Sequence, residues 1–205
     1  MKPEELDILR RHFPNNALDM VAEAYTTRKF RLTFKKSRAT KLGDFRPPRR
    51  QGSVACITLN GDLNPYQMLI TFIHEVAHYD VHFGYGRQVK PHGDEWKRTF
   101  ATLMQPYLTP DIFPPDILGQ LAEHLKNPAA SSGTDTTLSR LLHDYDGHDE
   151  STLTVDDLPD NAVFSLANGL TLRKGKLLRK YYLCTTLDGR RRYRVAAIAK
   201  CVMAQ

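Results

Sequence analysis

A long amphipathic helix with clear start and stop signals occupies the middle of the sequence and limits the folds available to it. Asn64 is a favoured N-cap residue, and Pro65 follows at the first helical position, where its missing N–H costs nothing. Gly84 and Gly86 would end the helix. We therefore predict a helix over residues 65–83, and its apolar face carries Leu69, Phe72, Ile73, Val76 and Ala77.

A metal-binding pattern lies within this helix. The residues HEVAH place His74 and His78 four positions apart, so both imidazoles lie on one face and can hold one ion. Glu75 lies beside them and can reach a water molecule at the ion as a general base. The pattern is typical of zinc hydrolases, and the alternative interpretation is a surface helix with incidental histidines.

A catalytic zinc site needs a third protein ligand. His82 continues the spacing, but it lies about 12 Å along the helix axis from His74, too far for one ion to bind both. His92 and Glu95 follow the glycine turn, where the chain can fold back toward the helix. Spacing alone leaves both His92 and Glu95 open as the third ligand.

Four segments together resemble the SprT-like family, which includes the Spartan proteases. They are residues 40–48 (TKLGDFRPP), 63–66 (LNPY), 74–78 (HEVAH) and 91–96 (PHGDEW), in order and with sensible gaps. The resemblance covers roughly residues 15–110. It implies a minimal zincin-like metalloprotease domain, in which helices pack on a small sheet, and a zinc metalloendopeptidase activity.

The resemblance also implies roles for individual residues. By position, His74, His78 and His92 would hold one Zn²⁺ ion, and Glu75 would be the catalytic base. Glu95 then becomes a neighbour of the site without an assigned role. A partner for the negative charge that develops on the substrate carbonyl is not fixed, and the candidates are Tyr85, Arg87 and His82.

The remaining pattern predicts an α+β chain with a small antiparallel β domain after the metallopeptidase domain. We expect helices over residues 3–12, 17–27, 116–126 and from about 93, and a short one through Leu138, Leu141 and Leu142. Strands are expected at 30–34 and 54–59, with a loop over 38–52 between them. Strand 54–59 is either the edge on which an extended substrate pairs or an ordinary core strand. Further strands are expected at 163–166, 170–173, 177–187 and 191–202, with Asn168-Gly169 and Asp188-Gly189 as hairpin turns.

Composition changes divide the chain into three parts. Residues 1–128 form the predicted metallopeptidase domain, 129–158 an acidic flexible linker, and 159–205 a small basic β-sheet domain. Residues 111–160 hold two basic and eleven acidic side chains, whereas residues 161–205 hold ten basic and one acidic. The region upstream is also basic, with thirteen Lys and Arg against six Asp and Glu in residues 1–52.

These basic regions suggest a nucleic-acid partner, and the alternative is that they are solvated faces or are neutralised by the acidic linker. The candidate contacts are Arg38, Lys41, Arg46, Arg179, Lys180, Arg191 and Arg192. Tyrosines interleave with the second cluster and could stack on bases. The resemblance to Spartan proteases, which act on proteins crosslinked to DNA, supports the same partner.

Cysteine usage points to a reducing compartment. Cys56, Cys184 and Cys201 are an odd, scattered set without a paired motif, which fits a cytoplasmic protein. Some members of the SprT-like family carry a second zinc site built on paired cysteines, and the lack of such pairs argues against that site in this chain. No stretch has the roughly 20 apolar residues needed to span a membrane. The leading hypothesis is a zinc-dependent peptidase acting on protein substrates, including DNA-bound ones. The alternative is a nucleic-acid-binding protein with a structural zinc site and no peptidase activity.

Overall fold

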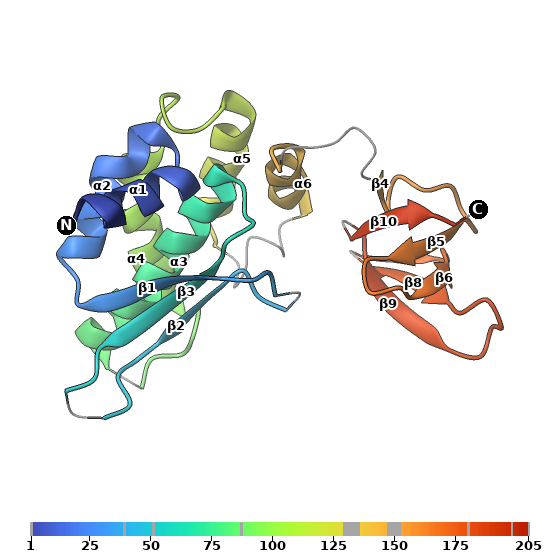
Figure 1. Cartoon of the computed structure of the whole chain (residues 1–205), viewed down its shortest axis with the longest axis horizontal. Helices are drawn as coiled ribbons and strands as arrows, with labels where there is room; N and C mark the ends of the chain where they lie inside the picture. The colour runs from blue at the N-terminus through green and yellow to red at the C-terminus, as the bar shows by residue number, and fades with distance from the viewer. Residues whose placement is uncertain are drawn as a thin grey trace. The chain divides into compact units, whose positions relative to one another are not determined.

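The chain forms two compact units, Met1–Asp146 and Gly147–Gln205, which are described separately (Figure 1). The computed structural model describes residues 2–38, 40–50, 52–86, 88–128, 136–146, 153–179, 181–197 and 199–204. Within these residues the fold is mixed α+β, with six α-helices and two sheets. None of the helices in this described part is long and apolar enough to cross a membrane.

The first unit contains a three-stranded sheet in the order β1-β3-β2. Its strands are β1 (Phe30–Lys35), β2 (Gly43–Arg46) and β3 (Ala55–Asn60). β1 runs parallel to β3, and β2 runs antiparallel to β3. The strands expected at 30–34 and 54–59 are confirmed, but the loop expected over 38–52 is wrong where it contains β2. Four residues, GDFR, are too few to show a strand alternation, and they form a strand because β3 offers them a pairing partner.

Strand β3 is the central strand of this sheet. It has a paired neighbour on each side, and five of its six residues are buried. The hypothesis that residues 54–59 form the substrate-binding edge is therefore wrong, and the core-strand alternative is correct. Of the two edge strands, β2 lies nearer the histidine helix, because α3 makes more contacts with β2 than with β1.

The helices of the first unit enclose one hydrophobic core with the sheet. α3 runs along one face of the sheet, as Figure 1 shows, and contributes Phe72, Ile73 and Val76 to this core. α3 ends two residues later than predicted, at Tyr85, where Gly86 adopts a positive φ of 81°. The six helices are α1 (Pro3–His12), α2 (Leu18–Thr26), α3 (Pro65–Tyr85), α4 (Asp94–Met104), α5 (Pro115–Leu125) and α6 (Thr136–Asp144).

Helix α6 belongs to the first unit, which therefore extends beyond the domain boundary predicted at residue 128. Leu138 and Leu142 are 0% exposed and belong to the core of the first unit. Asn64, the N-cap residue of α3, donates a hydrogen bond to the Leu142 carbonyl oxygen at 2.6 Å. The linker expected over 129–158 is therefore too long on this side, because two buried leucines outweigh the acidic composition around them. Residues 129–135 and 147–152 of that linker lie outside the described residues.

The second unit is an antiparallel sheet with its own core. Val155 and Leu158, also within the expected linker, are buried in that core. The expected strand 177–187 is wrong, because Arg179 has a positive φ of 55° and the chain turns there, so that Leu178 pairs with Tyr181. The expected strand 191–202 is likewise two strands. The strands are β4 (Leu153–Thr154), β5 (Val163–Leu166), β6 (Thr171–Arg173), β7 (Leu177–Leu178), β8 (Tyr181–Thr185), β9 (Arg192–Ala196) and β10 (Lys200–Met203).

Candidate metal centre

Helix α3 fixes the first two histidines of the candidate site. The Asn64 side chain accepts a hydrogen bond from the Gln67 backbone N–H at 2.9 Å, which caps the helix and sets its register. His74 and His78 lie one turn apart with ring centroids 4.9 Å from each other. Their Nε2 atoms are 3.2 Å apart, so both lone pairs can reach one point beside the helix.

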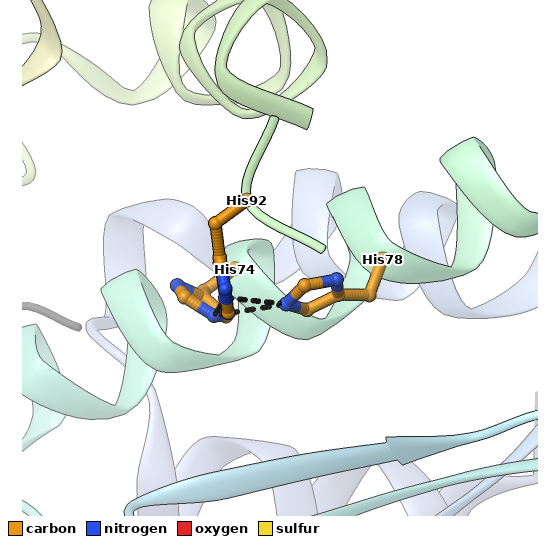
Figure 2. Close-up of side chains that lie close together, drawn as sticks. All are labelled: His74, His78 and His92. Atoms are coloured by element: carbon orange, nitrogen blue, oxygen red, sulfur yellow. Dashed lines mark hydrogen bonds between the residues drawn. The ribbon is translucent and has the colours of Figure 1, made fainter. Parts of the chain in front are cut away.

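The returning chain brings His92 to the same point. Its Nε2 atom lies 2.9 Å from Nε2 of His78 and 3.2 Å from Nε2 of His74, and Figure 2 shows the three rings converging. His92 has a φ of 57°, in the left-handed region that costs a non-glycine residue energy and is common at functional sites. Among the described residues, these three form the one group of His, Cys, Asp or Glu able to hold a metal ion.

The three nitrogens match the donor set of a zinc site. On a tetrahedral zinc ion with Zn–N distances of about 2.0–2.1 Å, ligand nitrogens lie roughly 3.3 Å apart. The observed separations of 2.9–3.2 Å are close to that value. Glu95, the alternative ligand, is half-buried in the first turn of α4 and is not part of this group.

Trp96 supports all three histidine rings from one side. Its indole is 0% exposed, and its ring centroid lies 4.6 Å from His74, 4.7 Å from His92 and 5.3 Å from His78. The indole N–H donates to the His74 carbonyl oxygen at 3.4 Å. A rigid apolar wall of this kind restricts the ring orientations and excludes water from one side of the site.

Burial keeps the histidines neutral, which is the form that binds metal. It lowers the pKa of His74 well below its usual value, and the neighbouring histidines act in the same direction. Burial, together with His92, lowers the pKa of His78 to about 4. Burial also lowers the pKa of His92. All three imidazoles therefore offer unprotonated nitrogens at neutral pH.

Glu75 lies beside the histidines and is 6% exposed. Burial raises the pKa of its carboxyl to about 8, although a hydrogen bond from the Phe45 backbone N–H opposes the rise. A raised pKa makes the carboxylate a stronger proton acceptor, whereas the positive charge of a nearby metal ion would lower the pKa. The side chain is thus held between α3 and strand β2.

A cavity of about 360 Å³ opens onto these side chains. One wall is strand β2 with the segment before it, from Thr40 to Phe45. The other walls are α3, with Thr71 and the two histidines, and His124 from α5. His124 is 7% exposed, and sequence reasoning missed it because it lies within an ordinary amphipathic helix and belongs to no motif.

The expected partners for a developing negative charge do not line this cavity. Tyr85 is 58% exposed at the end of α3. His82 packs on Phe45, with ring centroids 5.8 Å apart. Neither residue is among those that line the cavity. Arg87 lies outside the described residues.

The candidate nucleic-acid residues fall into two groups. Those of the first unit are used within the chain: Arg38 donates to Asn60 and Thr58, and Lys41 and Arg46 both bond Asp44. Partial burial raises the pKa of Asp44, but the hydrogen bonds from Lys41 and Arg46 lower it further, below its usual value. In the second unit, the three described candidates are exposed, and they are Arg179, Arg191 and Arg192. Lys180 lies outside the described residues.

The sequence model of the SprT-like family matches residues 11–114 of the chain. This match includes β1, β2, β3, α3 and all three histidines, and it ends before α5 begins. Neither the comparison with curated proteins nor the comparison with solved structures gives a match.

Proposed function

The chain belongs to the SprT-like family, a metal-dependent family of metallopeptidase type, and we propose that it is a zinc-dependent endopeptidase acting on protein substrates. The observation that carries the proposal is the convergence of three histidine Nε2 atoms, 2.9–3.2 Å apart, beside the buried carboxyl of Glu75. A structural zinc site normally closes with four protein ligands. The described residues supply three, which leaves a position for water and substrate.

In this proposal each residue has a separate task. His74, His78 and His92 hold Zn²⁺ through Nε2, in a zincin-like core. When bound, the ion polarises the substrate carbonyl and makes water acidic enough to attack it near neutral pH. Glu75 accepts a proton from the attacking water as the new C–O bond forms, and then delivers it to the leaving amine nitrogen as the C–N bond breaks.

Strand β2 is the proposed docking edge for the substrate. Its pairing partner β3 lies on one side, and no other described strand pairs with it. It also forms a wall of the cavity beside Glu75. An extended peptide can add to such an edge through main-chain hydrogen bonds, which suits protein substrates of varied sequence.

DNA-bound proteins are the proposed substrate class. The support comes from the exposed arginines of the second unit, because those proposed for the first unit already bond within the chain. In this proposal the second unit holds DNA through phosphate contacts while the first unit cleaves the protein. The proposed location is cytoplasmic, and the free thiols of Cys56, Cys184 and Cys201 agree with a reducing compartment.

The test compares wild type with Glu75→Gln on a DNA-binding protein substrate, with and without DNA, after measurement of zinc content. We expect equal zinc content, and cleavage reduced by about 10²–10⁴-fold in the variant, which is the usual contribution of a general base. Glu95→Gln is the matched control and should keep both zinc and activity. The alternative, a nucleic-acid-binding protein with structural zinc, predicts zinc and DNA binding but no cleavage by wild type.

A further inference from the structure

Gly43, the first residue of β2, lies directly against the side chain of Glu75. A Cβ atom at this position would lie 2.6 Å from Oε1 of Glu75 and 2.8 Å from its Cγ. It would also lie 2.9 Å from Cγ2 of Thr71, one turn earlier on α3. The φ of Gly43 is not in the positive region, so any residue could adopt its backbone conformation. Space alone, and not conformation, requires a glycine here.

We infer that Gly43 is a positioning residue for Glu75: its missing side chain lets the carboxylate lie against strand β2, within reach of the Phe45 backbone N–H. This inference rests on the proposed function, in which Glu75 is the proton acceptor. Strand β2 then has two roles, since it forms one edge of the sheet and sets where the proton acceptor lies.

Thr71 and strand β2 have little freedom to make room for an added methyl group, so the side chain of Glu75 is the part that has to move. Thr71 cannot rotate away cheaply, because its hydroxyl donates to the Gln67 carbonyl oxygen at 2.7 Å. Strand β2 is held by its pairing with β3, in which Gly43 lies opposite Leu59. Of the two residues that the added atom would meet, Glu75 is the freer to move, because its longer side chain has more rotatable bonds.

The size of the shift follows from the contact distance. Ordinary van der Waals contact begins at 3.4 Å, whereas the added Cβ would meet Oε1 at 2.6 Å. The carboxylate must therefore move by roughly 1 Å, and a misplacement of that size costs about 100-fold in rate at a catalytic site. No histidine atom is among the three atoms nearest to the added Cβ, which belong to Glu75 and Thr71, so we expect metal binding to be retained.

The first experiment measures kcat, KM and zinc content of full-length Gly43→Ala. We expect kcat to fall by about 100-fold, with zinc content unchanged and KM changed much less than kcat. Gly119→Ala is the matched control, because a Cβ at Gly119 meets nothing within 4 Å, and its activity should equal wild type. A loss of zinc in parallel with activity, or a Gly43→Ala enzyme as fast as wild type, would overturn the inference.

The second experiment does not depend on activity. The change in Tm caused by Gly43→Ala is measured in wild type and again in a Glu75→Ala background, where the Cγ and Oε1 atoms are absent. We expect a clear loss of Tm in wild type and a loss less than half as large in Glu75→Ala. If Gly43→Ala alone does not fold, the double variant should fold, which is the same coupling in a stronger form.

Together, the two experiments distinguish the positioning role of Gly43 from the proposed peptidase activity. Equal losses of Tm in both backgrounds, or a double variant that does not fold either, would show that the added methyl clashes elsewhere and would overturn the inference. Strong coupling in a wild-type protein that binds zinc but cleaves nothing would instead reject the proposed peptidase and leave the placement of Glu75 by Gly43 supported.

Discussion

Replacing Leu142 by alanine tests whether helix α6 is an integral part of the first unit. The Leu142 side chain is 0% exposed and packs in the same core as α3 and α5. Leu→Ala changes at fully buried sites cost about 2–5 kcal/mol in unfolding free energy, because they lose apolar burial and leave a cavity. For a unit of this size, about 3 °C per kcal/mol translates the loss into a fall of roughly 6–15 °C in Tm.

The assay can isolate the first unit, because Trp96 is the single tryptophan of the sequence and is buried in that unit. Unfolding in urea, followed by tryptophan fluorescence, therefore reports on residues 1–146 alone. The control is Leu178→Ala in the second unit, where the side chain is 39% exposed, and this signal should not change. A loss below about 0.5 kcal/mol for Leu142→Ala, the level of an ordinary surface substitution, would refute the packing of α6 and restore the linker interpretation.

Three further outcomes are expected. Trp96→Phe should weaken zinc affinity by about 10-fold in a chelator competition, because all three ligand rings lose part of their wall; unchanged affinity would contradict this role. Because burial lowers the pKa of all three histidines, zinc content after dialysis should begin to fall only at a pH below their ordinary value of 6.5; half-release near 6.5 would contradict these shifts. Lys174→Ala should destabilise the second unit by about 2 kcal/mol or more, measured by thermal unfolding, because the carbonyl oxygens of Asp156 and Leu158 lose their buried donor; an unchanged transition would contradict that.

The parts of the fold that the sequence predicted well depend on local signals. α3 follows from a cap, a proline and an apolar stripe within one segment, and the hairpin glycines Gly169 and Gly189 have the positive φ that such turns need. Strand β2 depends instead on a partner elsewhere in the chain. For α6 the sequence predicted the helix but not its packing: Leu138 and Leu142 belong to the core of the first unit, although the segment around them is acidic. Where contacts between distant parts of the chain determine the place of an element, the composition of its own segment does not predict that place.

The residues of the candidate site likewise fall into those that local spacing predicts and those that only the tertiary structure reveals. Helix geometry is enough to bring His74 and His78 together, since a spacing of four fixes them on one face. His92 could not be chosen over Glu95 by spacing, because the choice depends on a left-handed residue in the returning loop. His124 has no sequence signal at all, since only the packing of α5 brings it to the cavity.

The contributions of α5 and α6 indicate how much of the chain is needed to keep the candidate site intact. The family match ends at residue 114, yet α5 contributes His124 to the cavity wall, and α6 supplies the carbonyl that Asn64 bonds at the start of the histidine helix. A helix N-terminus has four backbone N–H groups without helical partners, so the residue that caps it influences the stability of the helix behind it. Because Asn64 caps α3 and bonds α6 at once, the segment beyond the family match is coupled to the helix that carries His74 and His78. The smallest piece of this chain that keeps the site intact should therefore end after α6, at Asp146, and not at the end of the family match.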